Sequence, residues 1–189
     1  MKLLRLALAG ALAFASVAMP ALAAEDDYLT IELKDGPVVV ELLPDAAPKH
    51  VARLKELASK GEYDNVAFHR VIEGFMAQTG DVEFGDMEDG FNPGRAGTGG
   101  SDLPDLPAEF SEIPFERGTV GMARSQDPDS ANSQFFIMFD EGSFLNGQYT
   151  VVGKVVSGME NVDKIKRGAG GNGEVSDPDR MVKVTVGRQ

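Results

Sequence analysis

The chain has no cysteine and no tryptophan among its 189 residues, and it has only two histidines. Without cysteine, the protein can form no disulfide, no thiolate site for zinc, no thiol nucleophile and no lipid attachment through sulfur. With His50 and His69 as the only imidazoles, a metal site built from several histidines is excluded as well. We therefore expect neither a metal nor another cofactor.

Other familiar catalytic and binding motifs are also missing. The acids between positions 81 and 89 lack the spacing and the closing glutamate of an EF-hand loop, so solvated loop acids are the better interpretation. No serine lies in a Gly-x-Ser-x-Gly motif, and we interpret His69 as a satisfied interior or edge histidine rather than a catalytic base. The glycine-rich segment 94–100 has no Gly-Lys-Ser/Thr ending, which favours backbone flexibility over phosphate binding.

Basic residues are scarce. The chain has 18 lysines and arginines against 30 aspartates and glutamates, and its formal net charge is −12. Such a surface repels nucleic acid and anionic membranes. We expect neither of them as a partner.

The N-terminal residues have the organisation of a secretory signal peptide. Lys2 and Arg5 precede the uncharged, alanine- and leucine-rich run 6–18, which is followed by Pro20 and by small residues around Leu22. A retained membrane anchor is the alternative, although proline and alanine suit it poorly. The pattern favours export to a bacterial periplasm, with secretion as the alternative.

One domain boundary follows from this pattern. We expect residues 1–23 to be removed as a signal peptide, and residues 24–189 to fold as one domain. Removal takes away two basic residues and no acidic one, so the net charge becomes −14. A domain of this length can bury a substantial apolar core.

The mature chain is dominated by strand patterns. Leu29, Ile31 and Leu33 alternate with polar residues, and Asp35-Gly36 predicts a tight turn into the apolar run 37–43. Six further strands are expected, which makes eight in total. They are placed at 65–72, 75–78, 118–123, 134–139, 150–156 and 181–186.

Two helices are expected beside the strands. The first is capped by Asp45, has Pro48 in its first turn, and ends before Gly61, with apolar residues on one face. The second is short and covers about 160–167. Alternation in the last strand favours antiparallel pairing, so we predict a mainly β fold: a closed eight-stranded antiparallel barrel capped by two α-helices.

The segment 81–117 fits no regular element, and a loop of this length is usually functional or disordered. Some apolar residues also fall outside the expected core. The two-residue period places Phe136 with Gln134, and Met76 with Gln78, on faces that we expect to meet water. A groove with apolar pockets and a few polar donors suits a small ligand or a peptide. The alternative is that Phe136 and Met76 fill a satellite core under the long loop.

Several motifs together resemble one known family, the cyclophilin-type peptidyl-prolyl cis-trans isomerases. The resemblance covers residues 28–187, and the motifs stand in family order. They are FHRVIEGFMAQTGD at 68–81, GTGG at 97–100, MA at 122–123, NSQFFI at 132–137 and FLNG at 144–147.

The resemblance implies both an activity and a site. Arg70 would be the catalytic residue, a donor to the twisted X-Pro amide, although pairing with a nearby acid is the alternative role. Gln78 and Gln134 would contact the peptide backbone. The remaining implied substrate-binding residues are Phe75, Met76, Ala123, Phe136, Phe144, Leu145 and Tyr149, with Arg124 as a possible addition.

Three of these positions depart from the common family pattern. Phe144 stands where many eukaryotic members carry tryptophan, which implies weak cyclosporin binding. Arg124 replaces a frequent asparagine and Tyr149 a frequent histidine, which implies a shift toward acidic neighbours of proline.

The implied role is to accelerate folding of exported proteins, with proline-containing peptides and unfolded chains as partners and a monomer as the default state. A non-catalytic proline-peptide or holdase module on the same fold is one alternative. A barrel carrying a small apolar ligand is another, which the tight filling of small barrels argues against.

Overall fold

The protein is built around one antiparallel sheet. The computed structural model describes residue 24 and residues 26–188, so the predicted signal peptide lies outside the described residues. The strands neighbour one another in the order β3-β4-β6-β5-β7-β2-β1-β8. They are β1 (Tyr28–Leu33), β2 (Gly36–Leu42), β3 (Arg70–Ile72), β4 (Met76–Thr79), β5 (Thr119–Met122), β6 (Phe135–Met138), β7 (Val151–Ser157) and β8 (Lys183–Val186).

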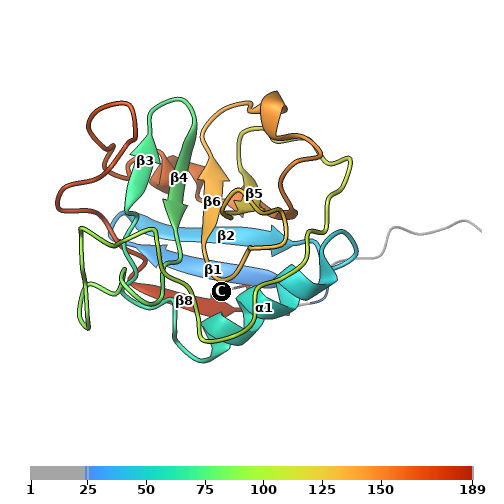
Figure 1. The fold of residues 1–189 in the computed structure, drawn as a ribbon, viewed down its shortest axis with the longest axis horizontal. Coiled ribbons are helices and arrows are strands. Elements are labelled where there is room, and N and C mark those ends of the chain that lie inside the picture. Colours follow the sequence, from blue (N-terminus) through green and yellow to red (C-terminus); the bar gives the residue numbers. More distant parts are fainter. Residues whose placement is uncertain (1–23, 25, 189) are drawn as a thin grey trace, which may run out of the picture.

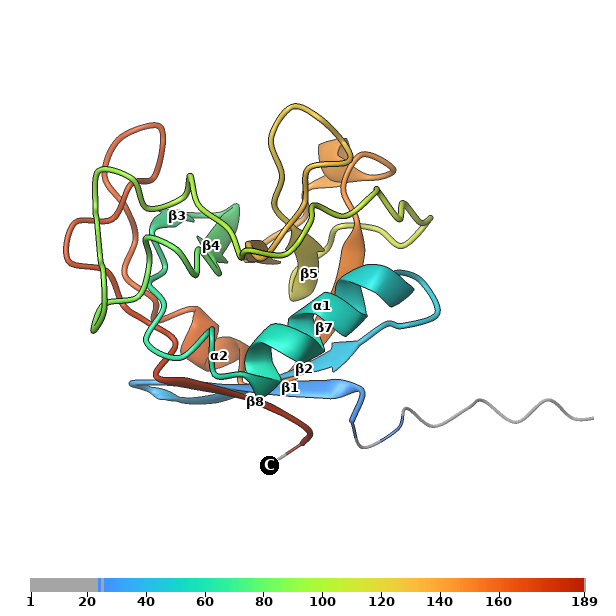
Figure 2. The same ribbon diagram turned by 60° about the horizontal axis from the view of Figure 1, so that its bottom comes forward.

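The sheet curls into a half-barrel around the main core, with β1, β2 and β8 on one side and β3 and β4 opposite (Figures 1 and 2). Helix α1 (Pro48–Ser59) lies against β8, and the short α2 (Met159–Val162) lies against β2. The predicted mainly β architecture with two helices is confirmed. Within the part of the chain that the structure describes, neither helix is long and apolar enough to cross a membrane.

The predicted closure of the barrel is not confirmed, because the sheet is open between β8 and β3. The segments before these strands do touch: Phe68 N–H donates to the Asp179 carbonyl at 2.8 Å, and Met181 N–H donates to the Val66 carbonyl at 2.9 Å. Regular pairing cannot extend along them, because Asn65 has a left-handed φ of 63° and Pro178 has no backbone N–H.

The same interruption shortens one predicted strand. Of the predicted range 65–72, only Arg70–Ile72 pairs as a regular strand. The second helix is likewise shorter than the predicted 160–167 and comprises Met159–Val162. The first hairpin is confirmed: Leu33 pairs with Gly36 across the turn, and Gly36 has a φ of 129°, which side chains rarely allow.

Helix α1 buries the face that the sequence predicts, including Val51, Leu54 and Leu57. The predicted cap by Asp45 is wrong, since residue 47 precedes the helix and no side chain of its own caps it. A carboxylate from the long loop takes that place: Glu109 Oε2 accepts from the N–H groups of Lys49 at 3.0 Å and His50 at 3.2 Å. It also bonds to His50 Nδ1 at 2.8 Å.

This capping contact gives stability a pH dependence. Burial raises the pKa of Glu109, but its hydrogen bonds to His50 and to the helix N–H groups outweigh burial and leave the pKa lowered. The stabilisation is therefore present above the ordinary carboxyl pKa of about 4.3 and is lost as the pH falls through the lowered value. Glu109→Gln should reduce the free energy of unfolding by about 1–2 kcal/mol at pH 7. Urea titrations at pH 7 and at pH 3 would measure it, and an equal deficit at both pH values would contradict the assignment.

The loop 81–117 contains no helix or strand, as the sequence predicts. One buried side chain organises its first half. The carboxylate of Asp81 accepts from the backbone N–H groups of Glu83 at 3.1 Å, Phe84 at 2.9 Å, Gly97 at 2.6 Å and Gly99 at 2.9 Å. The long segment is therefore held against the sheet rather than left free.

Candidate functional site

The strand register places three side chains of the site in one row. Arg70 of β3 lies opposite Gln78 of β4, and Gln78 lies opposite Phe136 of β6. In the adjacent row, Val71 pairs with Ala77 and Ala77 pairs with Ile137. All three are buried in the main core. Because side chains alternate across a sheet, the first row projects from the outer face of the half-barrel.

Arg70 is held by neutral acceptors. Its Nε donates to the Asn172 carbonyl at 2.9 Å, and its Nη1 donates to Gln78 Oε1 at 3.3 Å. Burial lowers the pKa of Arg70, but a guanidinium remains protonated near neutral pH. Among the described residues no carboxylate pairs with it, which argues against the alternative of an ion pair.

A chain of hydrogen bonds continues from Arg70 along the row. Gln78 Nε2 donates to Gln134 Oε1 at 3.0 Å, and Gln134 Nε2 donates to the Gly99 carbonyl at 2.8 Å. Since Gly99 is itself tied to Asp81, the long loop fixes the far end of the chain. Both glutamine side chains are only partly buried, so they can also meet a ligand.

Beside this polar row lies an apolar cavity of about 320 Å³. Ten of the eleven residues that the sequence assigned to the site line this cavity. The eleventh, Gln134, does not line it but is hydrogen-bonded to Gln78, which does. The lining residues are Arg70, Phe75, Met76, Gln78, Ala123, Arg124, Phe136, Phe144, Leu145 and Tyr149. We refer to this space as the apolar cavity.

The floor of the apolar cavity is more buried than the sequence suggests. Phe136 is 5% exposed and Met76 is 2% exposed, so the prediction that both face water is wrong. Phe136 stacks on Phe115 with ring centroids 5.7 Å apart, and Phe115 belongs to the long loop, which no periodic pattern reveals. The two residues thus join the satellite cluster that was the alternative interpretation, while still lining the cavity.

The rim is formed by aromatic and basic side chains. Phe144, on the short 3-10 helix η1 (Ser143–Leu145), is 64% exposed and lies 5.5 Å from the Phe75 ring. The guanidinium of Arg124, which also lines the cavity, lies 4.3 Å from the centre of the Tyr149 ring. Arg124 also donates to the carbonyls of Ser125 and Gln148, both at 2.8 Å. These contacts fix a second cation at the cavity mouth.

Gly121 of β5 continues the outer row, opposite Phe136, and a Cβ there would lie 2.6 Å from both the Phe115 and Phe136 rings. Gly121→Ala should displace the Phe136 ring and raise KM for a proline peptide, the substrate that the motif resemblance implies, by about tenfold, with a smaller change in kcat. Steady-state kinetics would test this. Gly171→Ala is a matched control, because a Cβ at Gly171 would meet no atom within 4 Å; equal effects of the two changes would refute the packing argument.

Two residues near the site behave differently from the sequence predictions. His69 is buried, but its ring nitrogens have no hydrogen-bond partner among the described residues, so the prediction of a satisfied histidine is wrong. Asn172, which supplies the carbonyl acceptor for Arg70, was not predicted. Its contribution is a backbone oxygen, so the residue type carries no signal for it.

Comparisons with known proteins agree on one family. Residues 28–186 match the family described as "Cyclophilin type peptidyl-prolyl cis-trans isomerase/CLD". A "Probable peptidyl-prolyl cis-trans isomerase" of Brucella suis biovar 1 is 64% identical over 178 residues, which are 94% of this chain and 88% of the relative.

Solved structures lead to the same family. A cyclophilin from Hirschia baltica superposes with a TM-score of 0.74 at 27% identity, covering 87% of this chain and 75% of the other. A cyclophilin-type isomerase of Cryptosporidium parvum, crystallised in the presence of the dipeptide Ala-Pro, gives a TM-score of 0.73 at 26% identity. That superposition covers 86% of this chain and 99% of the other.

Proposed function

Because the chain belongs to the cyclophilin family of peptidyl-prolyl cis-trans isomerases, we propose that Arg70 and the apolar cavity together catalyse rotation about X-Pro bonds. This proposal rests on the unpaired guanidinium of Arg70. Its guanidinium lies at the cavity wall without an acidic partner, and its Nη2 makes no hydrogen bond to any described residue. A positioned cationic donor is thus available to a ligand.

The reaction needs such a donor and little else. Rotation about an X-Pro bond must overcome a barrier of roughly 18–20 kcal/mol from amide resonance, and unaided it takes tens to hundreds of seconds. When the amide twists, its nitrogen regains a lone pair that can accept a hydrogen bond, whereas the planar ground state offers none. A donor at that nitrogen binds the transition state more tightly than the substrate, which lowers the barrier.

The apolar cavity supplies a fixed point for the rotation. The pyrrolidine ring of proline would lie against Met76, Phe136 and Leu145, which are all buried, while Gln78 and Gln134 would bond the peptide backbone. Holding one half of the substrate in this way uses part of the binding energy to orient the X-Pro bond for rotation. The crystallisation of the Cryptosporidium relative with Ala-Pro supports a proline peptide as the ligand.

The physiological role in this proposal rests on the N-terminal sequence. A removable signal peptide at residues 1–23 would deliver the domain to the periplasm, where it would assist the folding of exported proteins as a monomer. The net charge of −14 that remains after removal suits a soluble folding helper.

The decisive experiment is NMR exchange spectroscopy on a short Ala-Pro peptide with the purified protein. Catalytic amounts of protein should raise the cis-trans exchange rate well above the spontaneous rate. Binding without acceleration would instead favour the non-catalytic module on the same fold. If the protein neither binds the peptide nor accelerates its exchange, the proposed site is refuted.

The fixed cations predict a substrate preference. Arg70 and Arg124 both line the apolar cavity, and neither forms an ion pair within the described part of the chain. Peptides with glutamate before proline should therefore show about three- to tenfold higher kcat/KM than peptides with lysine there. The ratio should shrink at high salt and in the variant Arg124→Ala. A flat profile across glutamate, alanine and lysine would rule out this effect.

A further inference from the structure

A glycine-rich turn covers the outer edge of β3, the strand that carries Arg70 and ends the sheet. It comprises residues 168–174, with the sequence GAGGNGE, and we call it the glycine turn. Val71 N–H donates to the Gly173 carbonyl at 2.8 Å, and Gly168 N–H donates to the Val71 carbonyl at 2.9 Å. β3 is therefore held between β4 on one side and the glycine turn on the other.

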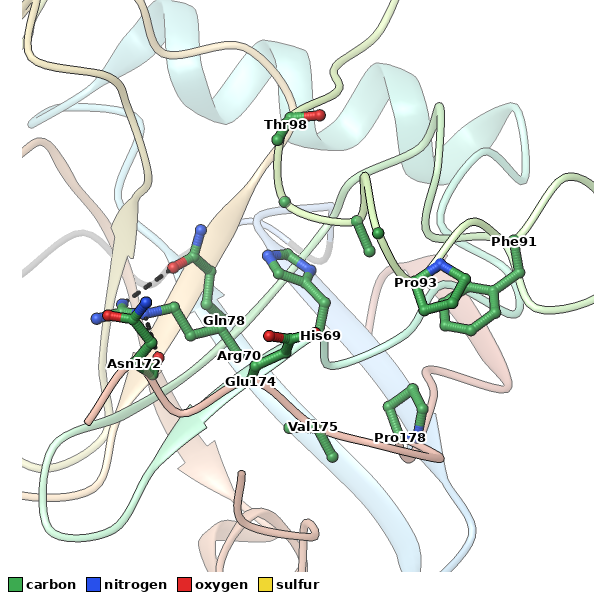
Figure 3. A pocket seen from close by; sticks show the side chains of 13 residues that line it. His69, Arg70, Gln78, Phe91, Pro93, Thr98, Asn172, Glu174, Val175 and Pro178 are labelled. Atoms are coloured by element: carbon green, nitrogen blue, oxygen red, sulfur yellow. Dashed lines mark hydrogen bonds between the residues drawn. The ribbon is translucent and has the colours of Figure 1, made fainter. Parts of the chain in front are cut away.

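The glycine turn also holds the side chain of Arg70. The guanidinium lies between Gln78 and Asn172 (Figure 3), with Nε donating to the Asn172 carbonyl at 2.9 Å and Nη1 donating to Gln78 Oε1 at 3.3 Å. A guanidinium is planar and rigid, so two bonds from different nitrogens fix its plane and its rotation within that plane. The directions of the N–H groups on Nη2 are thereby fixed as well.

This orientation of Arg70 has a competitor. The side chain lines both the apolar cavity and a second cavity of about 400 Å³. Glu174 also lines the second cavity, and its carboxylate forms no ion pair within the described part of the chain. Because a carboxylate attracts a guanidinium and a free arginine has many rotamers, the orientation toward the apolar cavity has to be selected.

One residue allows the glycine turn to come close enough to make that selection. Gly173 has a left-handed φ of 69°, which side chains rarely adopt. A Cβ at this position would collide with Ile72 Cγ1 and lie 2.9 Å from the Val71 carbonyl oxygen. A Cβ at Gly171 would meet no atom within 4 Å. The close approach to β3 thus depends on Gly173 and not on every glycine of the turn.

We propose that the glycine turn is a positioning element for isomerisation: the Asn172 carbonyl, placed by Gly173, directs the free Nη2 donor of Arg70 toward the X-Pro amide. This inference rests on the proposed function, since the turn has this task only if Arg70 bonds the twisted amide. The turn itself does not line the apolar cavity, so it acts through Arg70. Its contribution therefore falls on kcat and not on substrate binding.

The first test displaces the glycine turn. Gly173→Ala should push the turn away from β3 and misalign Arg70. We expect kcat for the Ala-Pro peptide to fall by about ten- to fiftyfold, because a misplacement of about 1 Å in a catalytic group can cost up to 10²-fold, while KM changes by less than about twofold. Gly171→Ala, which adds the same methyl group to the same turn without a clash, should change neither constant.

A double-mutant cycle separates positioning from general damage. In Arg70→Ala no guanidinium is left to direct, so adding Gly173→Ala should lower kcat further by less than about twofold. A turn that only supports the fold would instead lower kcat by the same factor with and without Arg70.

The Nε–H group of Arg70 reports its bond to the turn directly. In the parent protein and in Gly171→Ala, its exchange with solvent should be about tenfold or more slower than that of the exposed Arg188, because it is bonded to the Asn172 carbonyl. Gly173→Ala should remove this protection. If Gly173→Ala does not fold, the parent protein still decides, since an unprotected Nε–H of Arg70 would overturn the proposal.

Failure of the inference and failure of the proposed function give different results. If the parent protein accelerates exchange but Gly173→Ala retains its kcat, or loses the same factor in the Arg70→Ala background, the positioning role is overturned and the proposed function stands. If the parent protein does not accelerate exchange at all, the proposed function fails, and the positioning role fails with it.

Discussion

Replacing Arg70 by alanine is expected to lower kcat/KM for an Ala-Pro peptide by about 10²- to 10³-fold, the loss typical of removing one transition-state donor. The effect should fall mainly on kcat, because in the proposed mechanism Arg70 bonds the twisted amide and not the planar substrate. Arg70→Lys should recover little of the activity, since an ammonium lacks the planar fork that lets Arg70 bond Asn172 and Gln78 at the same time. NMR exchange rates for the three proteins would measure these losses.

Arg124→Ala is the matched control for this experiment. It also removes an arginine from the wall of the apolar cavity, but the guanidinium of Arg124 is bonded to the carbonyls of Ser125 and Gln148. We expect its loss to change kcat for the neutral Ala-Pro peptide by less than about fivefold. If the two alanine variants lost kcat equally, general electrostatics rather than a directed donor would explain the result.

Replacing Asp81 by alanine is expected to give the largest loss of stability, about 3–5 kcal/mol. The side chain is fully buried and accepts four backbone hydrogen bonds, and each bond to a charged acceptor is worth roughly 1.5–3 kcal/mol before the loop relaxes. The midpoint of thermal unfolding should fall by roughly 6–20 °C for a domain of this size. Calorimetry would measure the change.

Two variants show whether Asp81 acts through the loop. Asp81→Asn can keep an oxygen acceptor for Glu83 and Phe84, but its NH₂ group cannot accept from Gly97 and Gly99. The Gly97 and Gly99 amides should then exchange with solvent faster than in the parent protein. Asp86→Ala, which removes only exposed bonds to Glu88 and Asp89, should cost less than about 1 kcal/mol. Comparable losses for Asp81→Ala and Asp86→Ala would exclude the special role of Asp81.

The fold was predictable where a local pattern coincides with a local structure. The alternation in β1, the turn before Gly36 and the apolar face of α1 are all readable within a dozen residues, and each is found. Only residues 70–72 of the strand predicted at 65–72 are found. Asn65 has a left-handed backbone, and the segment that faces it across the opening between β3 and β8 contains Pro178, which has no backbone N–H. Barrel closure depends on both segments at once, so neither sequence pattern alone could decide it.

The residues that form the site could be predicted from the sequence, but the contacts that hold them in place could not. The family motifs named the residues that the apolar cavity brings together. The burial of Phe136 depends on Phe115, a residue from a segment without periodicity. The cap on α1 comes from Glu109, and one acceptor for Arg70 is the Asn172 carbonyl, 102 positions away. Such long-range contacts between unpatterned segments leave no local signal.

The pairing of β8 with β1 has a consequence for biosynthesis. β1 begins at Tyr28 and its partner β8 ends at Val186, so this pair joins the first strand of the sheet to the last one in the sequence. A nascent chain in which β8 has not yet been synthesised would leave one edge of β1 unpaired and would lack Val184, a buried core residue. Contacts between segments so far apart in the sequence are expected to form slowly. β1 can therefore gain its second partner only after every other strand of the sheet has been synthesised, and until then it exposes an unpaired edge.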